Sequence, residues 1–134
     1  MTPLEFGQKI LAEQPFSVLL GAELTELEIG RAELRLLLKD KHKQQHGFAH
    51  GGAVAYLADN ALTYAGGSVL SNPITLEMKI NYIRPGIGTA LIARAEAVSS
   101  GKRQAVCECK AYALQEDGEE KLCAAALGTI MARD

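Results

Sequence analysis

The sequence predicts an α+β domain in which an antiparallel sheet of five to six strands wraps around one central buried helix, with a second helix at the N-terminus. Residues 53–70 are apolar nearly all round at helical spacing, which is typical of a buried helix. Residues 74–82 alternate apolar and polar side chains, which is typical of a strand with one buried face. Small side chains share a face in two later segments, so a helix can approach them closely. They are Ala93, Ala95, Ala97, Ala105, Cys107, Cys109, Ala111 and Ala113.

The N-terminal helix is predicted over residues 3–13, because the chain begins with a full set of helix-start signals. Thr2 can cap the helix, Pro3 fits the first helical position, and Glu5 completes a capping box. With 134 residues the chain suits a single domain, residues 1–134. Turn signals separate most of the predicted strands. These strands lie at residues 17–29, 31–38, 74–82, 88–99, 102–115 and 121–133.

Composition excludes several classes of protein. The net charge is −2 and the basic residues are scattered, so no nucleic-acid partner is expected. No apolar run reaches the roughly 20 residues that span a bilayer, and the chain lacks a basic, apolar leader at its start. The three cysteines are an odd number, which favours a reducing compartment over a disulfide framework. We therefore expect a cytoplasmic protein that does not contact a membrane.

A glycine-rich segment followed by an isolated acid is the strongest functional signal. Residues 44–52 read QQHGFAHGG and enter the apolar segment, whose only carboxylate is Asp59. Gly51 and Gly52 would present bare N–H groups at the positive end of the helix, where they can polarise a carbonyl. Asp59 can act as a base or a nucleophile. The combination predicts a catalytic site for acyl chemistry.

The spacing of these two parts has a consequence for assembly. Gly51 and Asp59 are eight residues apart, about 12 Å along a helix at 1.5 Å per residue. The oxyanion donor and the base must each lie within about 3 Å of the reacting atoms, and an Asp side chain is too short to close the gap. A second, antiparallel copy of the helix would bring Asp59 to Gly51 of the other copy. We therefore predict a composite site in a homodimer.

The element order, the His-Gly-Gly entry to the helix, the acid eight residues after Gly51 and the turn at residues 82–86 (YIRPG) resemble the hotdog-fold acyl-CoA thioesterases. The resemblance covers residues 15–131 and is greatest to the branch with the phenylacetate-pathway and glutamate-type 4-hydroxybenzoyl-CoA thioesterases. It implies a catalytic carboxylate at Asp59 and a polarising N–H at Gly51. It also implies substrate contacts from Gln44 and His50, a water-placing hydroxyl at Thr63, and self-association as a homodimer or homotetramer.

Two routes of hydrolysis stay open at this stage. Asp59 can activate a water held with Thr63, or attack the thioester itself to give a mixed anhydride. Coenzyme A would be part of the substrate, so no separate cofactor is expected. Three basic residues in predicted turns are candidates for binding its phosphates: Arg84, Lys102 and Arg103. The acyl group and the thiol carrier, coenzyme A or an acyl-carrier protein, are not determined by the sequence.

Three other interpretations are weaker. His42, His46 and His50 recur every four residues and would align on a helix as zinc ligands, but the glycines among them disfavour that helix and no fourth ligand is near, so no metal is expected. A non-catalytic acyl-CoA-binding protein would lack a water path to Asp59. A hydratase or dehydratase would pair its acid with a histidine, and none follows Asp59. Hydrolysis is favoured.

Overall fold

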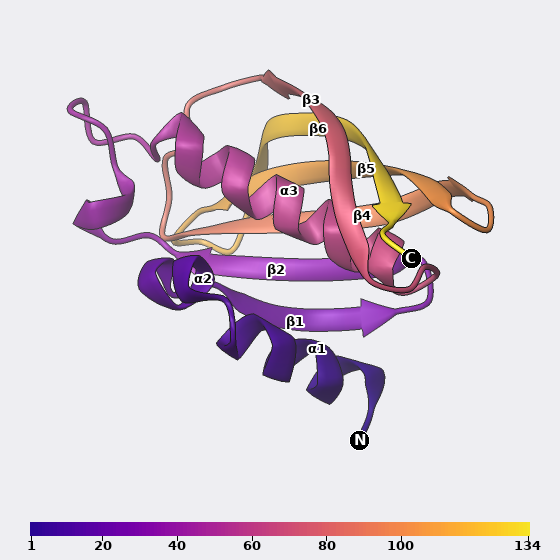
Figure 1. Ribbon diagram of the computed structural model, residues 1–134. Helices are drawn as coiled ribbons and strands as arrows, with labels where there is room; N and C mark the ends of the chain where they lie inside the picture. Colours follow the sequence, from indigo (N-terminus) through magenta and orange to yellow (C-terminus); the bar gives the residue numbers. More distant parts are fainter.

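A computed structural model describes residues 1–134 and contains one six-stranded antiparallel sheet that curves around a central helix (Figure 1). The strand order is β1-β2-β4-β5-β6-β3, so β3 pairs with β6 and lies at an edge. The predicted fold class is confirmed. The elements are α1 (Pro3–Ala12), α2 (Pro15–Leu20), β1 (Glu23–Glu28), β2 (Arg31–Leu37), a short 3-10 helix η1 (Asp40–His42), α3 (Gly51–Gly67), β3 (Pro73–Tyr82), β4 (Ala90–Ser100), β5 (Gln104–Leu114) and β6 (Glu120–Ala132).

The N-terminal segment differs in part from its prediction. The capping box of α1 forms as expected, with Thr2 and Glu5 bonding to each other's backbone N–H groups. The strand predicted for residues 17–29 is wrong in its first part, because residues 15–20 form the short helix α2. Pro15 occupies the first helical position, and Gly21 ends the helix in the left-handed conformation at φ 85°. The six residues of α2 are too few for an alternating pattern to distinguish helix from strand.

The core lies between α3 and the small-residue face of the sheet. The side chains predicted to line that face are buried in β4 and β5, apart from the half-buried Ala97. On the helix side, a Cβ atom added to Gly66 would lie only 2.7 Å from Ile130 on β6. The backbone of α3 therefore packs directly on the sheet, as the rows of alanine and cysteine predict. None of the helices has the length and apolar character needed to cross a membrane.

One side of α3 is less buried than its composition predicts. The sheet covers one face of the helix, and Tyr64 ties another to α1 by donating a hydrogen bond to the Gly7 carbonyl at 2.8 Å. A strip between α2 and β3 stays partly open, and we call it the open strip of α3. It is the part of the molecule where polar side chains of α3 meet the surface. The open strip consists of Gly52, Ala55, Tyr56, Asp59 and Thr63.

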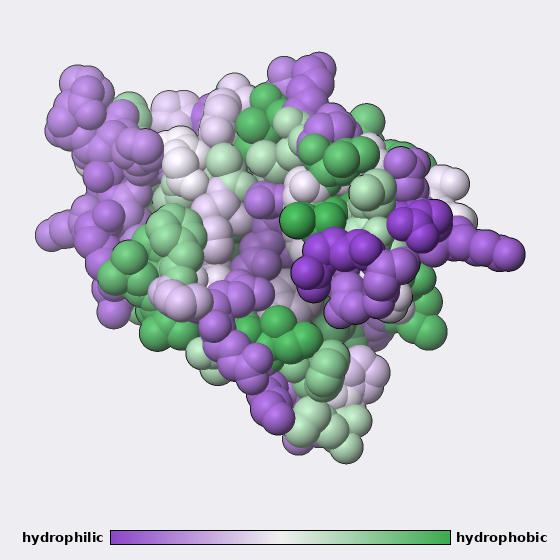
Figure 2. Space-filling model, viewed as in Figure 1, coloured by the Kyte–Doolittle hydropathy of each residue, from purple (hydrophilic) through white to green (hydrophobic).

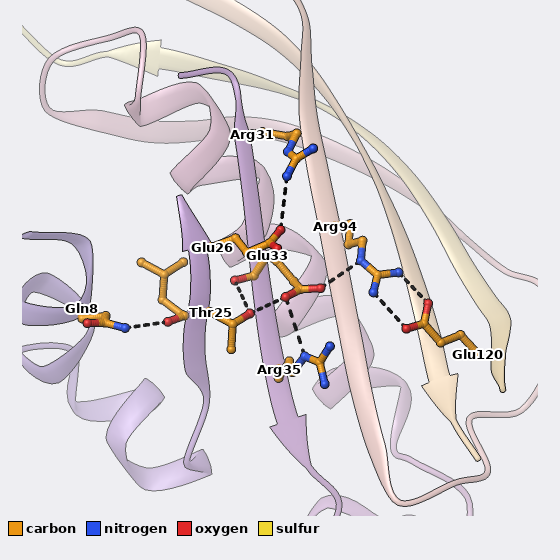
Figure 3. A network of polar contacts seen from close by, with 9 residues as sticks. Gln8, Thr25, Glu26, Arg31, Glu33, Arg35, Arg94 and Glu120 are labelled. Carbon is orange, nitrogen blue, oxygen red and sulfur yellow. Dashed lines mark hydrogen bonds and ion pairs between the residues drawn. The ribbon is translucent and has the colours of Figure 1, made fainter. Parts of the chain in front are cut away.

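The outer face of the sheet carries a network of charged side chains (Figure 3). Glu33 on β2 is only 5% exposed and accepts a hydrogen bond from Arg94 Nε on β4 at 2.9 Å. Arg94 also forms a bidentate ion pair with Glu120 on β6, with N–O distances of 2.6 and 2.9 Å, and its guanidinium lies over the ring of Tyr112. These contacts join β2, β4 and β6 across the face opposite α3, so they stabilise the sheet on which the helix rests.

Candidate active site

The start of α3 presents one free backbone donor. His50 is the N-cap, and its Nδ1 accepts a hydrogen bond from the Gly52 N–H at 2.8 Å. The Gly51 N–H, by contrast, has no hydrogen-bond partner within the chain. The sequence assigned the same role to both glycines, whereas the structure distinguishes them. The Gly51 N–H is therefore the donor available to a ligand at the positive end of the helix dipole.

The loop before α3 is fixed in place around this donor. Residues 43–49 form a small hairpin closed by backbone hydrogen bonds. Ala49 N–H donates to the Gly86 carbonyl at 2.9 Å, which holds the turn after β3 beside the start of α3. The Tyr82 hydroxyl donates to the Gly51 carbonyl at 3.2 Å. The end of β3 and the start of α3 are thus held together.

Asp59 lies two turns along α3, half-buried on the open strip, and one of its oxygens is fixed. Its Oδ1 accepts a hydrogen bond from Thr75 Oγ1 on β3 at 2.7 Å. Its Oδ2 accepts none from the chain. A carboxylate held through one oxygen keeps its second oxygen oriented, with lone pairs free for a proton or a carbonyl carbon.

Thr63 and Thr75 form a chain of hydroxyl groups next to this carboxylate. Thr63 Oγ1 lies 2.8 Å from both the Asp59 carbonyl oxygen and Thr75 Oγ1. Each hydroxyl has one proton, and that of Thr75 is donated to Asp59 Oδ1. Thr63 therefore donates to the Asp59 carbonyl or to Thr75. When it donates to Thr75 it orients that hydroxyl, and its water-placing role stays a prediction.

Thr75 is a site residue that the sequence analysis missed. In the sequence it appears as one of several polar residues that alternate along residues 74–82, with nothing to separate it from its neighbours. Its half-buried side chain faces α3, whereas the next residue, Leu76, is exposed. A bulge between Thr75 and Glu77 changes the phase of the alternation, so that Thr75 shares the inner face with Met78 and Ile80. Simple alternation placed Thr75 on the outer face, so the sequence carried no signal for its role.

Gln44 points its side-chain oxygen back into its own loop. Oε1 accepts from the backbone N–H groups of His46 and Phe48, and so shapes the hairpin. The side-chain NH₂ has no partner within the chain. Gln44 thus has a structural role through its oxygen and keeps two donors for the predicted substrate contact.

The three histidines do not share a helix face. His42 lies in η1, is 2% exposed, and uses both ring nitrogens on backbone groups: Nδ1 accepts from Lys39 N–H and Nε2 bonds the Leu20 carbonyl. His46 lies in the hairpin, and His50 caps α3. The helix that would have aligned them as metal ligands does not form, because the segment is a 3-10 turn followed by a hairpin.

The three basic residues predicted to bind phosphates lie at two places. Arg84 follows β3 and lies near the start of α3. Lys102 and Arg103 lie in the turn between β4 and β5. The end of β4 contacts Gly30, whose N–H donates to Ser68 Oγ just after α3, so this turn lies toward the opposite end of the helix. Within one chain, only Arg84 is near the Gly51 N–H.

Comparisons with known proteins agree on the class of protein. Residues 46–120 match a family model described as the thioesterase superfamily. A putative esterase from Saccharolobus solfataricus is 32% identical over 123 residues, covering 90% of this chain and 79% of the relative. A 1,4-dihydroxy-2-naphthoyl-CoA hydrolase from Listeria monocytogenes is 31% identical over 107 residues, covering 78% and 85%. The crystal structure of a thioesterase family protein from Silicibacter pomeroyi superposes with a TM-score of 0.91 at 34% identity, covering 97% of each chain.

Proposed function

The chain belongs to the thioesterase superfamily and is a thioester hydrolase, and we propose that it cleaves an acyl-CoA at a site completed by two copies of the chain. The observation that carries the proposal is the pairing of an unpartnered N–H at the start of α3 with a carboxylate that has one oxygen free. The first can hold a developing oxyanion, and the second can supply the base or the nucleophile. The name of the Listeria relative, a CoA thioester hydrolase, supports coenzyme A as the thiol carrier.

The two groups cannot act on the same thioester within one chain. Gly51 and Asp59 lie in the same uninterrupted helix, Gly51–Gly67. Eight residues of α-helix separate them by about 12 Å along the axis. Both must come within about 3 Å of one reacting centre. A single chain therefore supplies two half-sites.

The edge strand β3 supports a specific way of joining them. β3 runs beside α3 in the opposite direction, with Thr75 bonded to Asp59 at one end and Tyr82 bonded to Gly51 at the other (Figure 1). Its outer edge has no neighbouring strand. Ile74 and Leu76 on it are 48% and 54% exposed, which is unusual for an edge strand facing water.

A two-fold axis through the middle of β3 would pair this edge with its copy in an antiparallel arrangement. The Thr75 end of one strand then lies beside the Tyr82 end of the other. Asp59 of one chain is thereby brought toward Gly51 of the partner subunit, and the same operation builds a second, equivalent site. The dimer is part of the chemistry in this arrangement.

In the proposed mechanism the thioester carbonyl oxygen accepts a hydrogen bond from Gly51 of the partner subunit. With Asp59 as base, Oδ2 takes a proton from water while the water oxygen bonds to the carbonyl carbon, and the resulting oxyanion is held by the N–H. The intermediate then expels the thiolate, which takes the proton from Asp59 Oδ2. With Asp59 as nucleophile, Oδ2 bonds to the carbonyl carbon, the thiolate leaves, and water cleaves the anhydride. Thr75 orients the carboxylate in either route.

The test is a thiol-release assay over a panel of aryl and straight-chain acyl-CoAs. Wild type should release coenzyme A, and Asp59→Asn should lose at least about 100-fold in kcat, because the amide is neither base nor nucleophile. Asp40→Asn is the matched control, since that carboxylate is fully exposed in η1. A wild type inactive on the whole panel contradicts the acyl-CoA assignment, and a fully active Asp59→Asn shows that another residue acts. Light scattering should give a dimer or a tetramer, and an active monomer would exclude the composite site.

A further inference from the structure

The loop between β2 and α3 is held by hydrogen bonds rather than by apolar packing. Residues 39–47 (KDKHKQQHG) include no apolar side chain. Figure 2 shows a hydrophilic surface over this loop, at the upper left, and apolar residues over the neighbouring α2. Burial of apolar surface is the main force that fixes a segment on a protein, so the position of this loop depends on the few polar groups that it buries.

His42 is the only buried side chain among residues 39–47, and the proposed chemistry gives it no role. It is 2% exposed, whereas His46 and His50 are exposed. Its Nδ1 accepts a hydrogen bond from the Lys39 N–H at 3.0 Å, so the neutral ring carries its proton on Nε2. Nε2 then donates to the carbonyl of Leu20, the last residue of α2, at 2.7 Å. The ring therefore joins the loop to α2.

The other contacts that hold the loop are of a different kind. Toward β3, the loop is held at its far end by the backbone hydrogen bond from the Ala49 N–H to the Gly86 carbonyl. Toward α2, Lys41 Nζ donates to the Leu19 carbonyl at 2.8 Å, but the lysine is exposed and water competes for this bond. The buried ring of His42 is thus the main anchor of the loop on the α2 side.

The backbone of His42 connects this anchor to the start of α3. The His50 N–H donates to the His42 carbonyl at 2.8 Å, which fixes the N-cap residue. The His50 carbonyl accepts hydrogen bonds from the N–H groups of Ala53 and Val54, at 2.9 and 3.2 Å. The peptide group between His50 and Gly51 bears the unpartnered N–H. It is therefore held on one side by the first turn of α3 and on the other by His42.

We propose that His42 is a positioning residue for the oxyanion donor: its ring fixes the loop on α2, its carbonyl fixes His50, and together they direct the Gly51 N–H. The inference rests on the proposed function, in which this N–H binds the thioester oxygen. A donor contributes fully only when it is already aimed at the position of the oxyanion. Misplacement by about 1 Å costs about 100-fold in rate. His42 acts on the reaction only through His50.

The experiment measures thiol release by two His42 variants on an acyl-CoA that wild type cleaves. In His42→Asn the amide oxygen can replace Nδ1, but no donor reaches the Leu20 carbonyl. Its kcat should fall by about 10- to 100-fold, with KM changed by less than about threefold, because the donor is displaced. In His42→Gln the longer amide can donate to Leu20 from the position of Nε2, and kcat should return to within about threefold of wild type.

Tyr64→Phe is the matched control for loss of a structural hydrogen bond. It removes the bond from a half-buried side chain to a backbone carbonyl, that of Gly7, between α3 and α1. It should lower Tm and leave kcat unchanged. A Tyr64→Phe variant that loses as much kcat as His42→Asn would show that weaker folding explains both losses, and would overturn the inference.

A double-mutant cycle separates positioning from folding. Gly51→Pro removes the N–H that His42 directs, so adding His42→Asn to it should cost less than about a further threefold. Added to Thr75→Val, whose lesion lies in the other half-site, His42→Asn should cost its full factor. A loss of folded protein would instead multiply with both lesions.

Amide exchange provides a readout that does not depend on activity. The His50 N–H should exchange at least about tenfold faster in His42→Asn than in wild type, whereas the Ser68 N–H, bonded to the Tyr64 carbonyl at the far end of α3, should keep its rate. Equal acceleration at both amides, or the full loss of kcat in the Gly51→Pro background, overturns the inference while the proposed function stands. A wild type that releases coenzyme A from no acyl-CoA contradicts the proposed function itself, and the positioning role with it.

Discussion

Two lesions in opposite half-sites should complement each other in a mixed dimer. The first is Gly51→Pro, which removes one N–H and little else. Gly51 is the first residue of α3, where proline fits, and His50 has φ −61° and ψ 137°, the extended conformation that a residue before proline prefers. Removing one oxyanion donor typically lowers kcat by about 100- to 1,000-fold. Gly51→Ala keeps the N–H, and its Cβ would lie 3.7 Å from the Tyr82 ring, so it should stay active.

The second lesion is Asp59→Asn, and the magnitude for the mixture follows from the two-fold arrangement. In a heterodimer, one site receives both lesions and the other receives neither. Random association makes about half of the dimers mixed, and each has one of its two sites intact. Co-expressed variants should therefore recover about a quarter of wild-type activity, although each alone is nearly inactive. A heterodimer purified by two different tags should reach about half.

Thiol release from one acyl-CoA at saturating concentration measures the recovery. The control pairs Asp59→Asn with Thr75→Val, whose lesions lie in the same half-site, and it should recover no fully intact site. If the donor and the acid acted within one chain, every site of the mixed dimer would carry a lesion. A co-expressed pair with no more activity than its parents would refute the composite site.

Four further predictions concern positioning, stability and thiol reactivity. Thr75→Val should lower kcat by about 10- to 100-fold because the proposed catalytic carboxylate, Asp59, loses its orientation, and Thr75→Ser should restore the activity. Glu33→Gln should lower the free energy of unfolding, measured in urea, by about 2 to 3 kcal/mol, because it weakens a buried charged pair with Arg94. Glu120→Gln should lower it by less than about 1 kcal/mol, because the Glu120 side chain is more exposed. The Arg94 hydrogen bonds lower the pKa of Glu120 below its usual 4.5. The stabilisation from this ion pair is therefore fully present above pH 4.5 and is lost as the pH falls through the lowered pKa. Below that pKa, wild type and Glu120→Gln should have the same free energy of unfolding. Burial raises the pKa of the Cys109 thiol to about 12, so native protein should resist thiol reagents at pH 8, and unfolding should expose it.

The fold and the placement of Gly51 and Asp59 on one helix could be predicted because both follow from local sequence patterns. The row of alanines and cysteines on β5 and the all-round apolar helix identify each other as packing partners. The distance of about 12 Å between Gly51 and Asp59 follows from their eight-residue spacing and the rise of a helix, and the helix forms over both residues. These features need no knowledge of which distant segments meet.

The rest of the site depends on contacts between distant segments, which no local pattern contains. Thr75 becomes a partner of Asp59 only because β3 crosses to the far edge of the sheet and pairs with β6. The difference between Gly51 and Gly52 arises from the orientation of one side chain, that of His50. The helix α2 was missed because six residues between a proline and a glycine carry too short a pattern.

In the proposed composite arrangement, the register of β3 is a condition for catalysis. If β3 paired with its copy in a register shifted by two residues, every side chain would stay on its own face. One subunit would nevertheless move by about 7 Å along the strand. Positioning within about 1 Å is needed, because larger displacements cost about 100-fold in rate. β3 contains a bulge between Thr75 and Glu77, directly after the residue that orients Asp59. Bulges bend a strand and restrict the registers in which it can pair, so this irregularity favours one alignment of the two half-sites over its neighbours.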